Sequence, residues 1–105
     1  MLTNEAVLKC FEEYLQKDPD CEVVLTRHGY AVLLWNEPRQ EWWEIFSCPT
    51  PEALFDKLLE AATQFHTCRL LQKSGADDLT EQEEAEVKQT RQYFRNLRTD
   101  EKILH

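Results

Sequence analysis

Apolar residues recur along the chain first at helical spacing, then in short alternating runs, and then at helical spacing again. From Asn4 to Lys17 they fall three and four positions apart, and Thr3 before them is a suitable N-cap. Asp18-Pro19-Asp20 ends this segment, because the residue before a proline is pushed out of the helical conformation. The pattern therefore predicts a single helix from about Asn4 to Lys17.

Three runs with strand character follow this helix, at Glu22–Arg27, Tyr30–Trp35 and Gln40–Phe46. His28-Gly29 separates the first two runs and predicts a two-residue hairpin turn. The polar break Asn36–Arg39 contains a proline and predicts a second hairpin loop. We therefore expect a three-stranded antiparallel meander.

The second helix has the clearest start signal in the chain. Thr50 is a suitable N-cap, and Pro51 suits the first helical position. The helix should continue to about Lys73 and stop at Gly75, which can adopt the left-handed cap conformation. Its apolar surface is broad, which favours a central place in the fold.

A third helix is predicted from the capping box Thr80-x-x-Glu83 to about Arg98, leaving residues 99–105 as a tail that we expect to fray. The order is α-β-β-β-α-α, without an internal repeat or a long linker. The sequence therefore predicts one α+β domain over residues 1–105, with helices packed mainly on one face of the meander.

The two hairpin loops predict a register, and the register assigns side chains to faces. Leu33 would lie opposite Val24 on one side and opposite Trp42 on the other. The face toward the helices would carry Val23, Leu25, Tyr30, Val32, Leu34, Trp43 and Ile45. The second face would carry Val24, Ala31, Leu33, Trp35, Trp42 and Phe46, with Glu22, Thr26, Gln40 and Glu44 between them.

The second face is too apolar for a simple water-exposed surface. Its aromatic side chains could each bury about 150–250 Å². Four arrangements are possible. The third helix could fold over this face, a second copy of the chain could pack on it, or another protein or a ligand could dock on it. The face could also remain an exposed apolar patch of tolerated size. We favour self-association. The interface candidates are Val24, Leu33, Trp35, Trp42 and Phe46.

Composition narrows the classes of partner. The 105 residues carry 12 Lys and Arg against 20 Asp and Glu, a net charge of −8. This charge argues against nucleic acid and anionic membranes as partners. No apolar run is long enough for a membrane span, and the first residues lack the basic start of a signal peptide. The 4 cysteines show no paired spacing, so we expect free thiols in the cytoplasm, and we predict neither a metal nor a cofactor.

The leading α-β-β-β-α order is similar to that of double-stranded RNA-binding domains. That family grips phosphates with a basic cluster at the start of the helix after the meander. In this chain the corresponding segment, residues 50–57, reads TPEALFDK and has the acids Glu52 and Asp56 where the family has lysines. The resemblance is confined to element order, and the charges speak against RNA binding.

We predict a small acidic module that binds proteins, as a homodimer or with another protein, and that is not an enzyme. The first alternative is a domain that binds a small molecule or regulatory ligand at the Trp35/Trp42 surface. The second alternative is an enzyme in which Cys48 and His66 form a thiolate–imidazole pair. Cys48 precedes Pro49 in a helix-entry connection, and His66 lies among apolar residues, so this pair has little local support.

Overall fold

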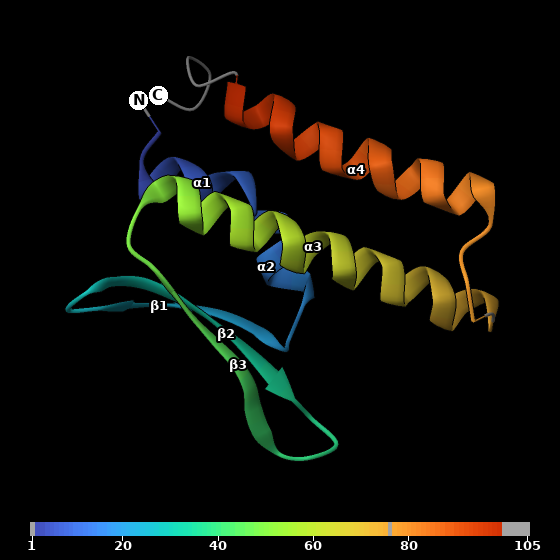
Figure 1. The fold of residues 1–105 in the computed structure, drawn as a ribbon, viewed down its shortest axis with the longest axis horizontal. Helices are drawn as coiled ribbons and strands as arrows, with labels where there is room; N and C mark the ends of the chain where they lie inside the picture. Colours follow the sequence, from blue (N-terminus) through green and yellow to red (C-terminus); the bar gives the residue numbers. More distant parts are fainter. Residues whose placement is uncertain (1, 76, 100–105) are drawn as a thin grey trace.

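Helices occupy both ends of the chain in the computed structural model, and a three-stranded sheet lies between them in sequence (Figure 1). The structure describes residues 2–75 and 77–99. The elements are α1 (Asn4–Cys10), α2 (Glu12–Lys17), β1 (Cys21–Thr26), β2 (Gly29–Asn36), β3 (Glu41–Cys48), α3 (Pro51–Ser74) and α4 (Glu81–Thr99). The strands form an antiparallel meander in the order β1-β2-β3, which confirms the predicted α+β class.

The first predicted helix is interrupted once. Phe11, with φ −104° and ψ 11°, separates α1 from α2. Its N–H still donates to the Val7 carbonyl, and its own carbonyl accepts from Leu15, so the two helices continue one another with a bend. The single helix predicted from Asn4 to Lys17 is therefore interrupted at this residue, whose side chain belongs to the core.

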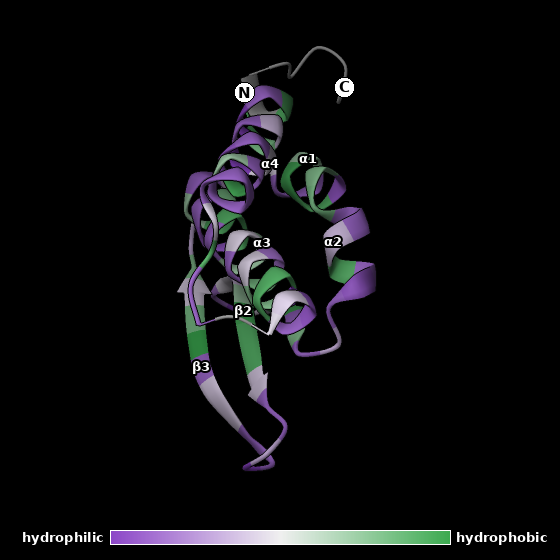
Figure 2. Ribbon diagram, turned by 90° about the vertical axis from the view of Figure 1, so that its right-hand side faces the viewer, coloured by the Kyte–Doolittle hydropathy of each residue, from purple (hydrophilic) through white to green (hydrophobic). Residues whose placement is uncertain are grey.

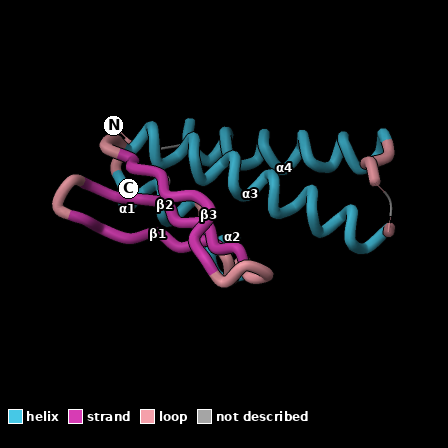
Figure 3. Tube along the Cα trace, turned by 60° about the horizontal axis from the view of Figure 1, so that its bottom comes forward, coloured by secondary structure: helices cyan, strands magenta, loops and turns pink. Residues whose placement is uncertain are grey.

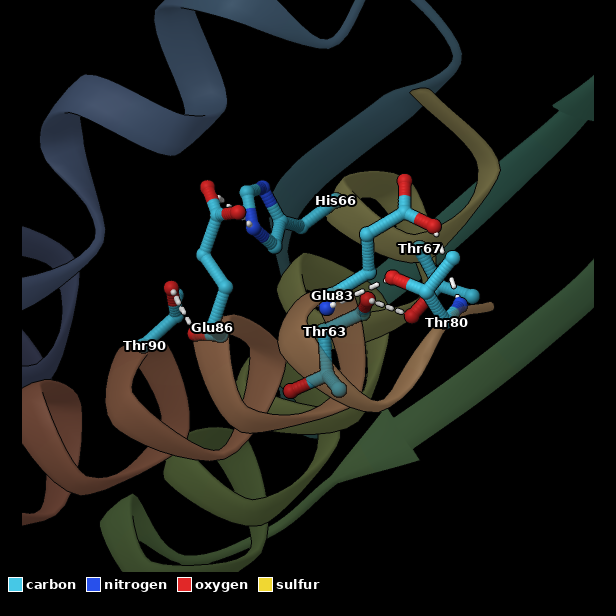
Figure 4. A network of polar contacts seen from close by, with 7 residues as sticks. All are labelled: Thr63, His66, Thr67, Thr80, Glu83, Glu86 and Thr90. Carbon is cyan, nitrogen blue, oxygen red and sulfur yellow. Dashed lines mark hydrogen bonds and ion pairs between the residues drawn. The ribbon is translucent and has the colours of Figure 1, made fainter. Parts of the chain in front are cut away.

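The start and stop signals of the later helices are confirmed. The Thr50 hydroxyl accepts from the Ala53 N–H at 3.1 Å, and Gly75 takes the left-handed cap of α3 with φ 70°. Thr80 and Glu83 exchange reciprocal bonds at the start of α4, as Figure 4 shows. Helix α4 includes Thr99, which was predicted to fray; residues 100–105 lie outside the described residues.

Helix α3 is the central element. It packs against β2 and β3 on one side, and it also contacts α1 and α4. Val32 on β2 and Leu54 and Leu58 on α3 are fully buried. The hydropathy colouring shows this apolar layer running through β2 and the facing part of α3 (Figure 2). None of the described helices is both long and apolar enough to cross a membrane.

The first hairpin turns one residue earlier than predicted. Arg27-His28 forms the loop, and Thr26 pairs with Gly29, whose φ of 107° favours glycine. Val24 therefore lies opposite Ala31 instead of Leu33. This shift of two residues keeps every side chain on its predicted face, because side chains alternate with a period of two.

The second hairpin contains a β-bulge that the sequence reading missed. Leu34 pairs with Glu44 but Trp35 pairs with Trp42, so Trp43 is an extra residue on β3. One extra residue exchanges the two faces for the rest of the strand. Phe46 therefore lies opposite Val32 on the helix side, and Ile45 lies opposite Leu33 on the other side. Both residues were assigned to the wrong face.

The end of the first hairpin extends past the helices (Figure 3). Leu25 lies there on the helix-facing side of β1, yet it is 70% exposed because no described helix reaches it. The prediction that helices cover the whole of this face was therefore wrong at the hairpin end.

Three phenylalanine rings join the helices. Phe11 lies 5.3 Å from Phe55 of α3 and stacks on Phe94 of α4 at 4.6 Å, measured between ring centroids. We predict that Phe94→Ala lowers the free energy of unfolding by about 3 kcal/mol, because it removes a buried ring and leaves a cavity. Urea unfolding measures this. Tyr93→Ala, at the exposed neighbouring residue, should cost much less, and equal losses would contradict the assignment.

Candidate functional site

The sheet face that points away from α3 carries a cluster of large apolar side chains, which we call the sheet patch. It consists of Val24, Leu33, Trp35, Trp42 and Ile45. Trp42 is 41% exposed and Ile45 is 65% exposed. The described helices all leave this face open, since α3 packs on its opposite side.

The two tryptophans of the patch are held in a defined arrangement. Their ring centroids are 4.9 Å apart in an edge-to-face contact. The Trp35 indole N–H donates to the Glu37 carboxylate at 2.7 Å, and the Gln40 side chain donates to the same carboxylate at 2.9 Å. The hairpin loop therefore fixes the indole of Trp35, which reduces the entropy that docking on it would cost.

Four of the five predicted interface residues share this face: Val24, Leu33, Trp35 and Trp42. Phe46 does not, because it points toward α3, where the Lys57 ammonium lies 3.3 Å from its ring centroid. Lys57 also pairs with Glu44 at 3.6 Å, so Glu44 too is on the helix side. Ile45 is the patch residue that the sequence reading missed, and the bulge at Trp43 explains the error.

A hollow of about 460 Å³ lies between the sheet and α3. Trp35 and Trp43 line it from the sheet, and Cys68 and Arg69 line it from α3. Trp42 is not part of its described wall. Trp35, near the end of β2, therefore borders both the sheet patch and this hollow, which is the concave surface that a ligand-binding module would need.

A larger depression, about 870 Å³ in volume, lies among the helices and is called the helical groove below. Helices α1 and α2 form one wall, α3 forms the floor and α4 forms the other wall. Phe65 and Leu70 contribute apolar surface from α3, and Tyr93 and Leu97 contribute it from α4. Sequence reasoning did not find the groove, because each helix was considered separately.

His66 reaches this groove from α3. Its Nε2 lies 3.7 Å from a carboxylate oxygen of Glu86 on α4, and the two side chains face each other between the helices (Figure 4). That nitrogen is buried and has no hydrogen-bond partner in the described chain. The contact is an ion pair whenever the imidazole is protonated, and it ties α4 to α3.

Cys48 and His66 do not form the alternative catalytic pair. Cys48 ends β3 just before α3, whereas His66 lies about 22 Å further along, since 15 residues of α3 separate His66 from Pro51. Burial also raises the pKa of the Cys48 thiol, which disfavours the thiolate that a nucleophile needs. The pairing of these two residues is therefore wrong.

A buried polar cluster joins α2 to β1. The Tyr14 hydroxyl donates to Asp18 at 2.7 Å, and the other Asp18 oxygen accepts from the Asp20 N–H at 3.0 Å. Burial raises the pKa of Tyr14, and the neighbouring Asp18 carboxylate raises it further. Desolvation likewise raises the pKa of Cys21. This cluster closes the turn after α2 and keeps its hydroxyl and thiol protonated.

No group of three potential metal ligands comes together among the described residues. Comparisons of the chain with family models, with curated proteins and with solved structures find no match in any of the three. The function is therefore inferred from the surfaces described above.

The four cysteines should differ sharply in reactivity. Cys68 is exposed, whereas Cys10, Cys21 and Cys48 are buried free thiols. We predict that a thiol reagent modifies one cysteine quickly in the native protein and the other three only on unfolding. Cys68→Ser should remove the fast phase, whereas Cys48→Ser should leave it intact. Fast modification of more than one thiol would contradict this arrangement.

We predict that the three buried thiols lower the free energy of unfolding at alkaline pH. Desolvation raises the pKa of Cys10, Cys21 and Cys48 above the ordinary value of 9.0. The unfolded chain then loses these protons at a lower pH than the folded chain. Well below pH 9 these thiols are protonated in both states and add no pH dependence; above pH 9 they should lower the free energy of unfolding, as measured by urea unfolding. A rise in stability there would contradict the burial.

Proposed function

We propose that the protein is a small binding module that associates with a second copy of itself through the sheet patch. The observation that carries this proposal is the row of large apolar side chains on an open sheet face, which ends at the paired indoles of Trp35 and Trp42. Large apolar patches are uncommon on monomers and mark interaction surfaces. Two copies related by a two-fold axis would bury identical patches.

The size of the sheet limits the expected strength of dimerisation. Strands β2 and β3 have 8 residues each, so the face is about 26 Å long and, across three strands, about 14 Å wide. Such a face covers about 360 Å² in projection. Stable specific interfaces bury about 800 Å² per partner, so this face is smaller than a standard interface. We therefore propose a dimer that dissociates on dilution.

Charge should oppose this dimer. Each copy carries a net charge of −8, so two copies repel one another at low salt. The patch itself is apolar, so its contact energy changes little when salt screens the charges. Association is therefore expected to strengthen with salt, the reverse of an interface held by ion pairs.

We further propose that the protein acts by binding alone, without catalysing a reaction, and that it does so in the cytoplasm. The burial of Cys48 and its separation from His66 support the first part. The four free cysteines suit a reducing compartment.

We predict that Trp42→Glu and Ile45→Glu each abolish dimerisation. Both place a charge within an apolar contact, where it would be desolvated without a partner. Sedimentation equilibrium over a concentration series measures the association, and circular dichroism checks that each variant is folded.

Trp43→Glu is the matched control. Trp43 is adjacent in sequence and 52% exposed, but it lines the hollow on the helix side of the sheet. It should leave the dimer intact. A wild-type protein that stays monomeric up to about 1 mM, or a Trp43→Glu variant as impaired as Trp42→Glu, would overturn the proposal.

A second candidate function is binding of a small ligand in the hollow beside Trp35. Its volume of about 460 Å³ is in the range of ligand sites, and Asp20, Gln64 and Arg69 supply polar groups at its wall. Trp43→Glu separates the two functions, because it should disturb the hollow and spare the dimer.

A further inference from the structure

The helical groove is a second surface, separate from the sheet patch. Its floor is α3, and the walls are α1 and α2 on one side and α4 on the other. Helices α1 and α4 also contact one another, where Phe11 stacks on Phe94. The elements that surround the groove are seen together in Figure 2.

The groove is apolar at its base. Phe65 lies edge-to-face with Tyr14 at 5.5 Å, and Tyr93 lies 5.4 Å from the buried ring of Phe94, in each case between ring centroids. Tyr93 is 57% exposed, and Phe65, Leu70 and Leu97 are half-buried. This part of the helical core therefore remains accessible to a partner.

The rim of the groove is basic although the protein is acidic. Lys9, Lys17, Arg69 and Lys73 line it, against the two acids Glu12 and Glu13. None of these four cations forms an ion pair with a carboxylate of the described chain. Carboxylates of a partner could therefore pair with them without breaking an ion pair, although the Arg69 guanidinium also lies over the Phe65 ring, 5.5 Å from its centroid.

We propose that the helical groove binds an acidic amphipathic helix of a partner protein. The apolar stripe of such a helix would contact Phe65, Leu70 and Tyr93, and Asp or Glu residues beside the stripe would face Arg69 and Lys73. Helix-in-groove binding of this kind uses apolar anchors at positions i, i+3, i+4 and i+7.

The length of the floor fixes the length of the partner segment. The lining residues of α3 extend from Ala62 to Lys73, which is about 17 Å of helix. A partner helix of about three turns spans this distance. Nucleic acid fits less well, because Glu12 and Glu13 and the net charge of −8 repel a continuous polyanion.

The test uses two synthetic peptides of about 18 residues, long enough to hold helical structure. Both carry leucine at i, i+3, i+4 and i+7; one has glutamate beside this stripe and its twin has lysine. Fluorescence anisotropy of the labelled peptides, titrated with the full chain, measures binding. We expect the glutamate peptide to bind at least about tenfold more tightly than the lysine peptide, with an affinity that falls as salt rises.

Charge-reversal variants locate the site. The double variant Arg69→Glu, Lys73→Glu should weaken the glutamate peptide about tenfold or more, since two attractions become repulsions. The matched control is Lys88→Glu, Arg95→Glu, which makes the same charge change at exposed positions of α4 outside the groove. Leu70→Gln should weaken both peptides, with folding checked by circular dichroism.

Several results would overturn the inference: equal binding of the two peptides, equal losses in the two double variants, or no binding of either peptide up to about 1 mM. Binding of dodecanoate without binding of either peptide would also overturn it, because the ligand of the groove would then be a small anionic amphiphile and not a helix. Trp42→Glu, which disrupts the proposed dimer, should bind the glutamate peptide as the wild type does. The two proposals can therefore fail independently.

Discussion

The packing of Phe11 is the contact on which the helical layer depends. This fully buried side chain meets Phe55 of α3 and Phe94 of α4, so one residue of the α1–α2 bend joins three parts of the chain. The backbone leaves helical geometry at this residue, where φ is −104°. The bend and the ring contacts belong together, because they position α1 and α2 against α3 and leave α3 as the element packed on β2 and β3.

Most of the fold could be predicted because its start and stop signals are local. Thr50 with Pro51, Gly75, and Thr80 with Glu83 each act through hydrogen bonds within a few residues, and all are formed in the structure. The alternating runs also predicted the three strands and their order. Such signals require no knowledge of the tertiary structure, which is why they could be read directly from the sequence.

The faces of β3 could not be predicted in the same way. An error of one residue in the first turn left the faces unchanged, whereas the single extra residue at Trp43 exchanged Ile45 and Phe46. Nothing in the run QEWWEIF marks the bulge, since either register places aromatic residues on both faces. The ion pair of Lys57 with Glu44 and the contact of Lys57 with Phe46 favour the observed register, and both depend on α3. The helical groove was missed for a related reason, as it exists only between helices.

The two proposed surfaces differ in the physical force that would act on each. The sheet patch presents apolar side chains, so burial of area would drive its association, and net charge would oppose it. The groove combines an apolar floor with unpaired cations, so an acidic partner would be attracted to it even though the whole protein repels acids. Because α3 lies between the two surfaces, one copy could engage both partners at once. A dimer formed through its sheets would then present two grooves, and a partner with two acidic helices would bind it more tightly than either helix alone.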